Sequence, residues 1–214
     1  MWYYYVTICI IGYLLGAINF ARVICHLKHK DISSMGSGNP GTMNMIRSMG
    51  LFWGVLTLIL DSLKGAIPTL LGSLLIGPEG MYAGGLSAVT GHVYPIWYKF
   101  RGGKGVATAI GVFAVASPIT SLCTFPALVL LLIIFKYGSA CNLIYLTVLT
   151  IEQGLLYHDV LAVSILLFAM WALVWYSHRE NLSRLISGKE HKTNLIKPIK
   201  RIKTDKNYPK SSAK

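Results

Sequence analysis

Charged side chains are scarce in this chain of 214 residues, since only 13% of them are Asp, Glu, Lys or Arg. Acidic residues are the rarest, because eight Asp and Glu stand against 20 Lys and Arg, and the eight never cluster. A soluble domain needs a mixed and charged surface, so this composition argues against a soluble protein. Apolar residues make up 54% of the sequence, and its mean hydropathy is +0.55. Both values indicate a membrane protein.

Several signatures of common sites are absent as well. The four cysteines, Cys9, Cys25, Cys123 and Cys141, show no C-x-x-C spacing, which argues against a disulfide framework and against a zinc site. The sequence contains no G-x-S-x-G nucleophile elbow, no Walker A loop and no Asp-rich metal motif. We therefore expect no metal and no other cofactor, and ATP is not implied.

Long apolar segments are what the sequence has in abundance. Seven of them recur, each near or somewhat below the ~20 residues that a helix needs to cross the hydrocarbon layer. They cover residues 2–25, 51–77, 81–98, 105–117, 119–135, 139–157 and 159–177. The segment 105–117 is short, which is typical of a partial span packed among its neighbours. We expect an all-α, polytopic integral membrane protein with about seven membrane-embedded helices.

The distribution of basic residues predicts the orientation in the membrane, because Lys and Arg collect in cytoplasmic loops. Eleven of them follow Tyr176, and most of the others form three groups. The groups are Lys28, Lys30 and Arg47, then Lys99, Arg101 and Lys104, and then Lys136. The turns at 77–80 and 152–159 carry acidic residues but no Lys or Arg. The pattern predicts an N-terminus outside, a C-terminus in the cytoplasm and seven crossings.

The net charge of +12 raises the question of the binding partner. The basic residues lie at the ends of membrane segments, where anionic headgroups attract them, so we expect the lipid bilayer as a partner and no nucleic acid. Residues 1–191 are interpreted as a single membrane domain and 192–214 as a basic cytoplasmic tail, disordered or lying on the membrane surface. The start, MWYYYV, has no basic region or early cleavage site, so we expect the first helix to be retained.

Three polar segments fall on the predicted cytoplasmic side, and the first is GSGNPGTMNMIR, residues 36–47. Gly36 and Gly38 permit close backbone approach and positive φ. Asn39 suits an N-cap and Pro40 suits the first helical position, so a short helix should begin at about residue 40. Free N–H groups at such a helix start form a site for an anion.

Side chains in the same segment fit that anion site. Ser37 and Asn39 lie beside the predicted helix start, and Arg47, two turns on, could bind a phosphate through two hydrogen bonds. The alternative is an ordinary capped loop before a membrane span, with Arg47 as a cytoplasmic anchor. The first segment taken alone leaves both interpretations open.

The second polar segment runs from Gly91 to Lys104, and its end, with the start of the next apolar run, reads KFRGGKGVATAIG. Gly102, Gly103 and Gly105 surround Lys104, which should fall in the first turn of the following helix. A lysine there meets the positive end of the helix dipole, so an anion should offset it. No Asp or Glu lies nearby, which favours an external anion such as a substrate phosphate. A plain interfacial anchor is the alternative, but an anchor does not need three glycines.

The third polar segment is HREN, residues 178–181, at the end of the last apolar run. His178 and Asn181 are three positions apart and should share a helical face. Arg179 is best explained as an anchor at a helix C-terminus. A histidine can orient or deprotonate a hydroxyl near neutral pH, and neither His178 nor Asn181 is needed for anchoring.

Three ionisable residues lie inside apolar segments, where charge is costly and often functional. Asp61 and Lys64 are three apart in LDSLKGAIP, and they suit either a functional site or a mutually paired structural couple. His92, in GHVYP, could be a ligand, a base or a buried hydrogen-bonding residue. The pattern leaves these alternatives open.

Together these residues resemble the PlsY family, the bacterial membrane acyl-phosphate:glycerol-3-phosphate acyltransferases. The resemblance runs from YLLGAINFA at Tyr13 to SHRENLSRLISGKEH at His191, and it includes GSGNPG, LDSLKGAIP and GHVYPIWYKFRGGKGVATAIGVFAVASP. It implies a compact seven-helix protein of the bacterial inner membrane with its active site facing the cytoplasm. It further implies that acyl phosphate and glycerol 3-phosphate yield 1-acyl-glycerol 3-phosphate and inorganic phosphate, and that neither acyl-CoA nor acyl carrier protein is required.

The resemblance also implies roles for individual residues. The catalytic set comprises Ser37, Lys104, His178 and Asn181, of which His178 and Asn181 would hold the glycerol moiety. The phosphate-binding set comprises Gly36, Ser37, Gly38, Asn39, Gly41, Thr42, Arg47, Gly103 and Lys104. Further candidates are Asn44, Asp61, Lys64 and His92. The general base stays open between His178, His92 and a phosphate oxygen of the substrate.

The sequence departs from the family pattern at three hydroxyl or cationic positions. Where the family usually reads GATN, this chain has GTMN, so a hydroxyl stands at Thr42 and Met43 occupies the usual Thr. Ala17 replaces the common Ser near the first helix, and Ser177 replaces the usual Arg before HREN. If the hydroxyl of the usual Thr binds phosphate, that contact is lost or displaced by one position here, and we expect activity to survive with weaker affinity.

Two other functions predict sequence features that differ from those of this chain. A transporter for a phosphorylated metabolite also has broken helices and buried charges, but it predicts an inverted repeat and polar residues spread through the membrane depth. The polar segments here gather at one face. A CDP-alcohol phosphotransferase would need the Asp-rich metal motif that the sequence lacks.

Overall fold

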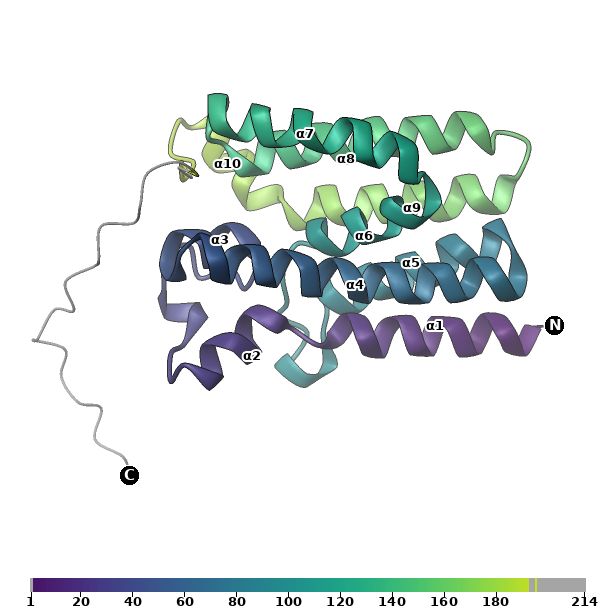
Figure 1. Cartoon of the computed structure of the whole chain (residues 1–214), viewed down its shortest axis with the longest axis horizontal. Helices are drawn as coiled ribbons and strands as arrows, with labels where there is room; N and C mark the ends of the chain where they lie inside the picture. The colour runs from purple at the N-terminus through teal and green to yellow at the C-terminus, as the bar shows by residue number, and fades with distance from the viewer. Residues whose placement is uncertain (1, 193–194, 196–214) are drawn as a thin grey trace, which may run out of the picture.

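The structure is a computed structural model that describes residues 2–192 and residue 195. Within these residues the chain forms helices and no strand, so the prediction of an all-α fold is confirmed (Figure 1). The helices are α1 (Trp2–Ala17), α2 (Phe20–Leu27), α3 (Thr42–Met49), α4 (Leu51–Ile76), α5 (Pro78–Val93), α6 (Val106–Ala116), α7 (Pro118–Phe135), α8 (Gly138–Leu156), α9 (Leu161–Ser177) and α10 (Arg179–Ile186), with 3₁₀ helices η1 (Ile32–Ser34) and η2 (Ile96–Tyr98).

Helix length decides which elements suit a membrane span. Among the described residues, four segments are long and apolar enough to cross a membrane. The first combines α1 and α2, and the other three are α4, α7 and α8. The pair α9 and α10, bent by 54°, makes a fifth if it is counted as one span. Helix α6 has only 11 residues, as its short apolar segment predicted. Each of the seven apolar segments of the sequence therefore contains a helix.

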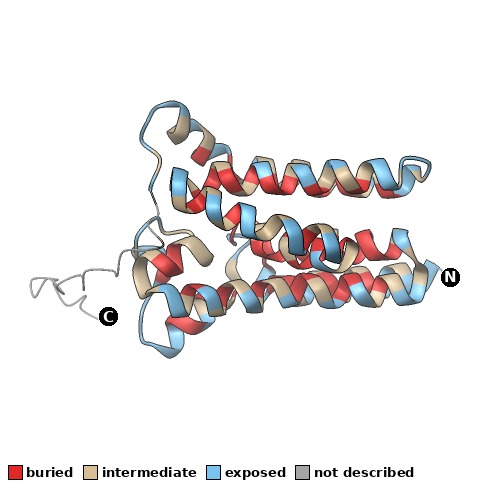
Figure 2. Ribbon diagram, turned by 45° about the horizontal axis from the view of Figure 1, so that its top comes forward, coloured by how far each residue is buried: buried red, intermediate tan, exposed pale blue. Residues whose placement is uncertain are grey.

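The outward faces of the helices are apolar, and the buried residues face one another between them (Figure 2). On α4 the exposed side chains include Phe52, Ile59, Leu63, Ile67 and Leu74. Patches of this extent are rare on soluble monomers, but they suit contact with lipid chains.

The inner helices pack through small residues that allow close backbone approach. A Cβ atom on Gly16 of α1 would lie 2.1 Å from the carbonyl oxygen of Ala88 on α5. On α6, a Cβ atom at Gly111 would lie 1.8 Å from the carbonyl oxygen of Ser62 on α4. Neither position accommodates even a methyl group, which explains the glycines and is typical of helix packing in membranes.

Two of the apolar segments that predict single helices are interrupted in the structure. Segment 2–25 is not continuous, because the chain breaks after Ala17 and Asn19 caps α2 by accepting a hydrogen bond from the backbone N–H of Arg22 at 3.0 Å. The side chain of Asn19 also donates to the carbonyl oxygen of Pro40 at 3.2 Å. Segment 81–98 likewise ends as α-helix at Val93, and the 3₁₀ helix η2 follows.

The two ends of the bundle differ in chemistry. Figure 1 shows α2, α3 and α10 together at the end opposite the N-terminus, so the first and third polar segments of the sequence lie there. Of the predicted tail 192–214, only Lys192 and Leu195 belong to the described residues. Lys192 lies 5.5 Å from the ring centroid of Tyr137, and Leu195 packs against the main buried apolar cluster. The remainder of the predicted tail lies outside the described residues.

Candidate active site

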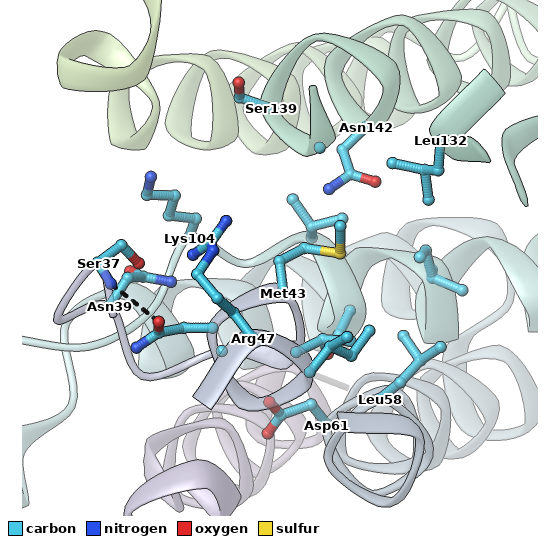
Figure 3. Close-up of a pocket in the computed structure, with 18 of the residues that line it drawn as sticks. Ser37, Asn39, Met43, Arg47, Leu58, Asp61, Lys104, Leu132, Ser139 and Asn142 are labelled. Atoms are coloured by element: carbon cyan, nitrogen blue, oxygen red, sulfur yellow. Dashed lines mark hydrogen bonds between the residues drawn. The ribbon is translucent and has the colours of Figure 1, made fainter. Parts of the chain in front are cut away.

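A cavity of about 370 Å³ lies at this end of the bundle and brings together most of the residues selected from the sequence. The predicted residues that line it are Ser37, Asn39, Gly41, Thr42, Asn44, Arg47, Asp61, His92, Lys104, His178 and Asn181. Gly36, Gly103 and Lys64 do not line it, and Gly38 lines a neighbouring cavity. Figure 3 shows Ser37, Asn39, Arg47 and Lys104 gathered at one side, while Ser139 and Asn142 reach the cavity from α8.

Asn44 holds the first polar segment in shape. Its side-chain oxygen accepts a hydrogen bond from the backbone N–H of Ser37 at 2.9 Å, and its side-chain nitrogen donates to the carbonyl oxygen of Met35 at 2.9 Å. Gly36 lies between these two residues with φ of +56°, and a Cβ atom there would come within 2.2 Å of the Asn44 oxygen. The loop therefore requires glycine, and Asn44 sets the position of Ser37.

The short helix after this loop begins later than the sequence predicted. Helix α3 starts at Thr42 with Gly41 as its N-cap and no side-chain capping hydrogen bond, so the expectation of an Asn39 cap and a start at about residue 40 is wrong. Asn39 and Pro40 instead extend the loop, and the Pro40 carbonyl is fixed by Asn19. The hydroxyl oxygen of Thr42 is buried beside the cavity without a hydrogen-bond partner among the described residues.

Arg47 projects from α3 into the middle of the cavity (Figure 3). Burial lowers the pKa of its guanidinium group, and the nearby carboxylate of Glu190 raises it. An arginine stays protonated at any physiological pH, so Arg47 contributes a fixed positive charge.

His92, at the end of α5, packs against the loop that carries Lys104 and stabilises it. The backbone N–H of Gly103 donates to the carbonyl oxygen of His92 at 3.0 Å, and a Cβ atom on Gly103 would lie 2.1 Å from Nε2 of His92. Glycine is thus required at 103 because the imidazole fills the space beneath it. The hydroxyl of Ser177 donates to the carbonyl oxygen of Lys104 at 3.0 Å, which ties the loop to the end of α9.

Lys104 lies just before α6 rather than in its first turn. The N-cap is Gly105, with φ of +81°, and the helix begins at Val106, so the predicted place of Lys104 is wrong by a few positions. Burial lowers the pKa of Lys104 to about 8, and the positive charge of Arg184 acts in the same direction. An anion bound beside this ammonium group would offset both effects.

His178 and Asn181 both reach the cavity, but not on one continuous helix. The chain bends by 54° between α9 and α10, and His178 lies at the bend. Nδ1 of His178 lies 2.8 Å from the carbonyl oxygen of Val174. A carbonyl only accepts, so Nδ1 carries the proton and Nε2 is an acceptor. Burial lowers the pKa of His178 to about 4, which keeps the ring neutral at physiological pH.

Glu190 is a member of this site that the sequence analysis did not select. Its carboxylate accepts hydrogen bonds from Asn181 at 2.5 Å, from Ser139 at 3.0 Å and from Arg184 at 3.0 Å. Burial alone would raise the pKa of Glu190, but these donors lower it below its ordinary value. Between Lys189 and His191, a single Glu resembles an ordinary surface residue, so only its place in the fold reveals the contact.

The far side of the cavity is an apolar groove between α4, α6 and α7. Its walls include Leu51, Val55, Leu58, Ile110, Phe125, Leu128, Val129 and Leu132. Met43 extends from α3 toward this side (Figure 3), and its side chain approaches Gly138 at the start of α8. One cavity thus joins a cationic end with an apolar end.

Asp61 and Lys64 form an ion pair with an N–O distance of 2.9 Å, and their side chains are only 1% and 3% exposed. Lys64 also donates to the carbonyl oxygen of Ile18 at 2.6 Å, where α1 and α2 are separated. Nδ1 of His92 lies 3.9 Å from the Asp61 carboxylate. These contacts link the break in the first span to α4 and α5, which favours the structural interpretation of the pair.

The described residues form helices with apolar outer faces, and their cationic pocket continues into an apolar groove. These are features of an integral membrane protein whose site suits an anionic molecule with an apolar chain. The family model for glycerol-3-phosphate acyltransferase matches residues 6–188. The chain belongs to this family, and the resemblance drawn from its motifs is confirmed.

Curated relatives and solved structures agree with this family. The glycerol-3-phosphate acyltransferase of Aquifex aeolicus is 40% identical over 187 residues, covering 86% of this chain and 96% of the relative. That of Geotalea daltonii is 41% identical over 192 residues, covering 86% and 95%. The crystal structure of PlsY, an integral membrane glycerol 3-phosphate acyltransferase, in its glycerol 3-phosphate form matches with a TM-score of 0.83 at 36% identity, covering 89% of this chain and 96% of that one. The lysophosphatidic acid form has a TM-score of 0.81.

Proposed function

We propose that this chain transfers an acyl group from acyl phosphate to the sn-1 hydroxyl of glycerol 3-phosphate, giving lysophosphatidic acid and inorganic phosphate. The observation that carries the proposal is the single cavity in which Ser37, Arg47 and Lys104 meet an apolar groove. Glycerol 3-phosphate and lysophosphatidic acid, named for the matching PlsY structures, fit a site of this kind. Neither acyl-CoA nor acyl carrier protein is needed as the donor.

The phosphate groups bind at the cationic end. Arg47 and Lys104 supply positive charge, and the hydroxyl of Ser37 supplies a further hydrogen-bond donor. The buried hydroxyl of Thr42 is a further donor, one position before the Thr that is usual in the family. Charge that develops on the departing phosphate during the reaction would be stabilised by the same groups.

His178 and Asn181 orient the attacking hydroxyl of glycerol 3-phosphate. Nε2 of His178 can accept a hydrogen bond from that hydroxyl, because Nδ1 already donates to Val174. With a pKa of about 4, however, His178 is a poor base at neutral pH. A phosphate oxygen, whose second pKa is about 6, is the better proton acceptor, so the proton passes to phosphate rather than to the protein.

The chemical step needs no enzyme nucleophile. The hydroxyl oxygen attacks the carbonyl carbon of the acyl phosphate, the new ester C–O bond forms, and the bond between that carbon and the phosphate oxygen breaks. The electron pair leaves with inorganic phosphate, and the hydroxyl proton is taken up by a phosphate oxygen. The protein contributes mainly by holding two reactants in contact and stabilising negative charge.

The acyl chain lies in the apolar groove between α4, α6 and α7. Leu58, Phe125 and Leu132 are among the residues that line this groove. Burial of each methylene contributes about 0.8 kcal/mol, so the groove accounts for donor binding without any polar contact to the chain.

The described part of the chain suits seven membrane-embedded helices with the site facing the cytoplasm of a bacterial inner membrane. Arg47 of α3, Lys104 before α6 and Lys136 after α7 belong to the site end, whereas Glu79 lies in the first turn of α5 and Asp159 in the connection from α8 to α9, at the opposite end (Figure 1). This charge distribution supports a cytoplasmic site and an N-terminus outside.

Phosphate release by the purified protein in detergent tests the function. Release from an acyl phosphate should depend on glycerol 3-phosphate, and Lys104→Met should reduce it about 10²–10³-fold while the protein keeps its helical circular dichroism. Lys136→Met, which removes an exposed lysine outside both cavities, is the matched control. Release without glycerol 3-phosphate, or full activity of Lys104→Met, would contradict the proposal. Uptake of labelled glycerol 3-phosphate by liposomes without any acyl transfer would favour the transporter.

A further inference from the structure

A second cavity, of about 880 Å³, lies beside the first at the same end of the bundle. The two linings share Ser37, Asn39 and Lys104, so the phosphate-binding residues form the boundary between the cavities. We call the second cavity the vestibule. Its remaining walls come from α2, from η1 and the loop before α3, from the loop between α5 and α6, and from α10.

The lining of the vestibule is strongly cationic. Arg22, Lys99, Arg101, Lys104 and Arg184 line it, whereas Glu180 is the single carboxylate in that lining among the described residues. Arg184 is partly balanced, because its guanidinium lies 3.9 Å from Glu180 and 3.0 Å from Glu190. The other four cations still give this wall a large positive excess. The apolar groove of the first cavity has no comparable set of charges.

The side chain of Arg22 and the backbone of the loop that carries Lys99 and Arg101 are held in place by contacts within the protein. Arg22 lies 4.8 Å above the ring centroid of Tyr98 and donates to the carbonyl oxygen of Arg101 at 3.3 Å. The loop that carries Lys99 and Arg101 is closed by hydrogen bonds from Phe100 to Pro95 at 3.0 Å and from Gly102 to Val93 at 3.1 Å. Such an arrangement offers a preorganised field to a small anion.

We propose that the vestibule is the entrance for the water-soluble phosphate ester and the exit for inorganic phosphate, separate from the apolar groove that receives the acyl substrate. This inference rests on the proposed function. A cleft lined by one sign of charge raises the local concentration of the opposite ion, and salt screens this effect over about 8–10 Å. The vestibule therefore acts on the soluble dianion before it reaches Ser37, Arg47 and Lys104.

The test compares two lysines of similar geometry. Lys99 and Lys136 are both exposed and have positive φ values of +52° and +64°, but only Lys99 lines the vestibule. In uncharged detergent at low ionic strength, Lys99→Gln should raise the KM for glycerol 3-phosphate about threefold, and Lys99→Gln with Arg101→Gln about tenfold. The inhibition constant of inorganic phosphate should rise in proportion. The KM for acyl phosphate should change less than twofold, and Lys136→Gln should change neither.

Salt and lipid separate the alternatives. At about 0.5 M salt the effect on the KM for glycerol 3-phosphate should shrink to less than twofold, since the charges are then screened. An unchanged KM at low salt, or an equal change in Lys136→Gln, would overturn the proposal. A rise in this KM that appears only in vesicles with anionic lipid would show that Lys99 and Arg101 bind lipid headgroups rather than the soluble substrate. That result would also overturn the proposal.

Equilibrium binding distinguishes failure of the vestibule from failure of the proposed function. If the wild-type protein shows no turnover dependent on glycerol 3-phosphate, the proposed function fails first. Calorimetric titration with inorganic phosphate then still tests the vestibule. Binding that weakens in the double variant only at low salt supports it, and binding unaffected by the substitutions contradicts it.

Discussion

The ammonium group of Lys104 donates a hydrogen bond to the side-chain oxygen of Asn181, which lies 77 positions further along the chain. Ser177 adds a second connection by donating to the carbonyl oxygen of Lys104 at 3.0 Å. These contacts join the glycine-rich loop before α6 to the bend between α9 and α10. A substitution in either segment should therefore alter the position of side chains in the other.

The alkaline limb of the pH profile should report Lys104. Its pKa of about 8 means that the ammonium group loses its proton as the pH rises through 8, so kcat/KM for glycerol 3-phosphate should fall above that pH. The arginine of Lys104→Arg keeps its charge across this range. The alkaline limb of this variant should therefore move to higher pH, even if its maximal kcat/KM is lower than that of the wild type. Steady-state kinetics between pH 6 and 10 measure this. The same alkaline limb in wild type and Lys104→Arg would contradict the assignment.

Asn44 is a positioning residue, because its side chain holds Ser37 in place. Asn44→Ala should therefore weaken the binding of glycerol 3-phosphate through Ser37. The substitution removes the hydrogen bonds to Ser37 and Met35, each worth about 0.5–1.5 kcal/mol. We expect kcat/KM to fall about 10–100-fold. Ser48→Ala is the control, because Ser48 is only 3.4 Å from Asn44 and contacts the same oxygen. Equal effects of the two substitutions would show that the Asn44 contacts do not set the loop.

The buried pair of Asp61 and Lys64 should matter for stability more than for chemistry. Lys64→Met leaves a buried carboxylate without its cation, which should destabilise the protein by about 3–5 kcal/mol. Adding Asp61→Asn removes the unpaired charge and should recover most of the loss. Thermal unfolding in detergent across this double-mutant cycle measures the coupling. Simply additive effects would show that the two residues act independently.

Glu190 should stabilise the site through its charge. Glu190→Ala removes three hydrogen bonds to the carboxylate, of which that from Arg184 is charged on both sides, so we expect a loss of about 1.5–3 kcal/mol in unfolding free energy. Glu180→Gln is the matched control, since its side chain is 75% exposed and 3.9 Å from Arg184. Chemical denaturation of both variants tests this.

The acid side of the stability curve gives a second test of Glu190. Its pKa is lower in the folded protein than its ordinary value of 4.5, so its contribution is present above about pH 4.5 and is lost as the pH falls through the folded pKa. The stability difference between wild type and Glu190→Ala should narrow in that window. A difference that stays constant below pH 4 would mean that packing, and not charge, accounts for the effect.

The amino-acid sequence by itself determined the elements and the chemistry of the polar loops. Apolar runs of the required length specify membrane helices, and the polar motifs identify Arg47, Lys104 and His178 as candidate site residues. Helix ends were less predictable. Asn39 and Gly41 are both acceptable caps, and in the structure Gly41 caps α3 while Asn19, in the break between α1 and α2, donates to the carbonyl oxygen of Pro40.

Only the tertiary structure decided which polar groups share a cavity and which serve the scaffold. His92 supports Gly103 because α5 brings the imidazole beneath the loop, and Lys64 reaches Ile18 because the first span breaks beside α4. Glu190 joins Asn181 only after α10 turns the chain back toward α8. Such contacts link residues far apart in sequence, and their energies depend on burial and distance, which local pattern does not encode.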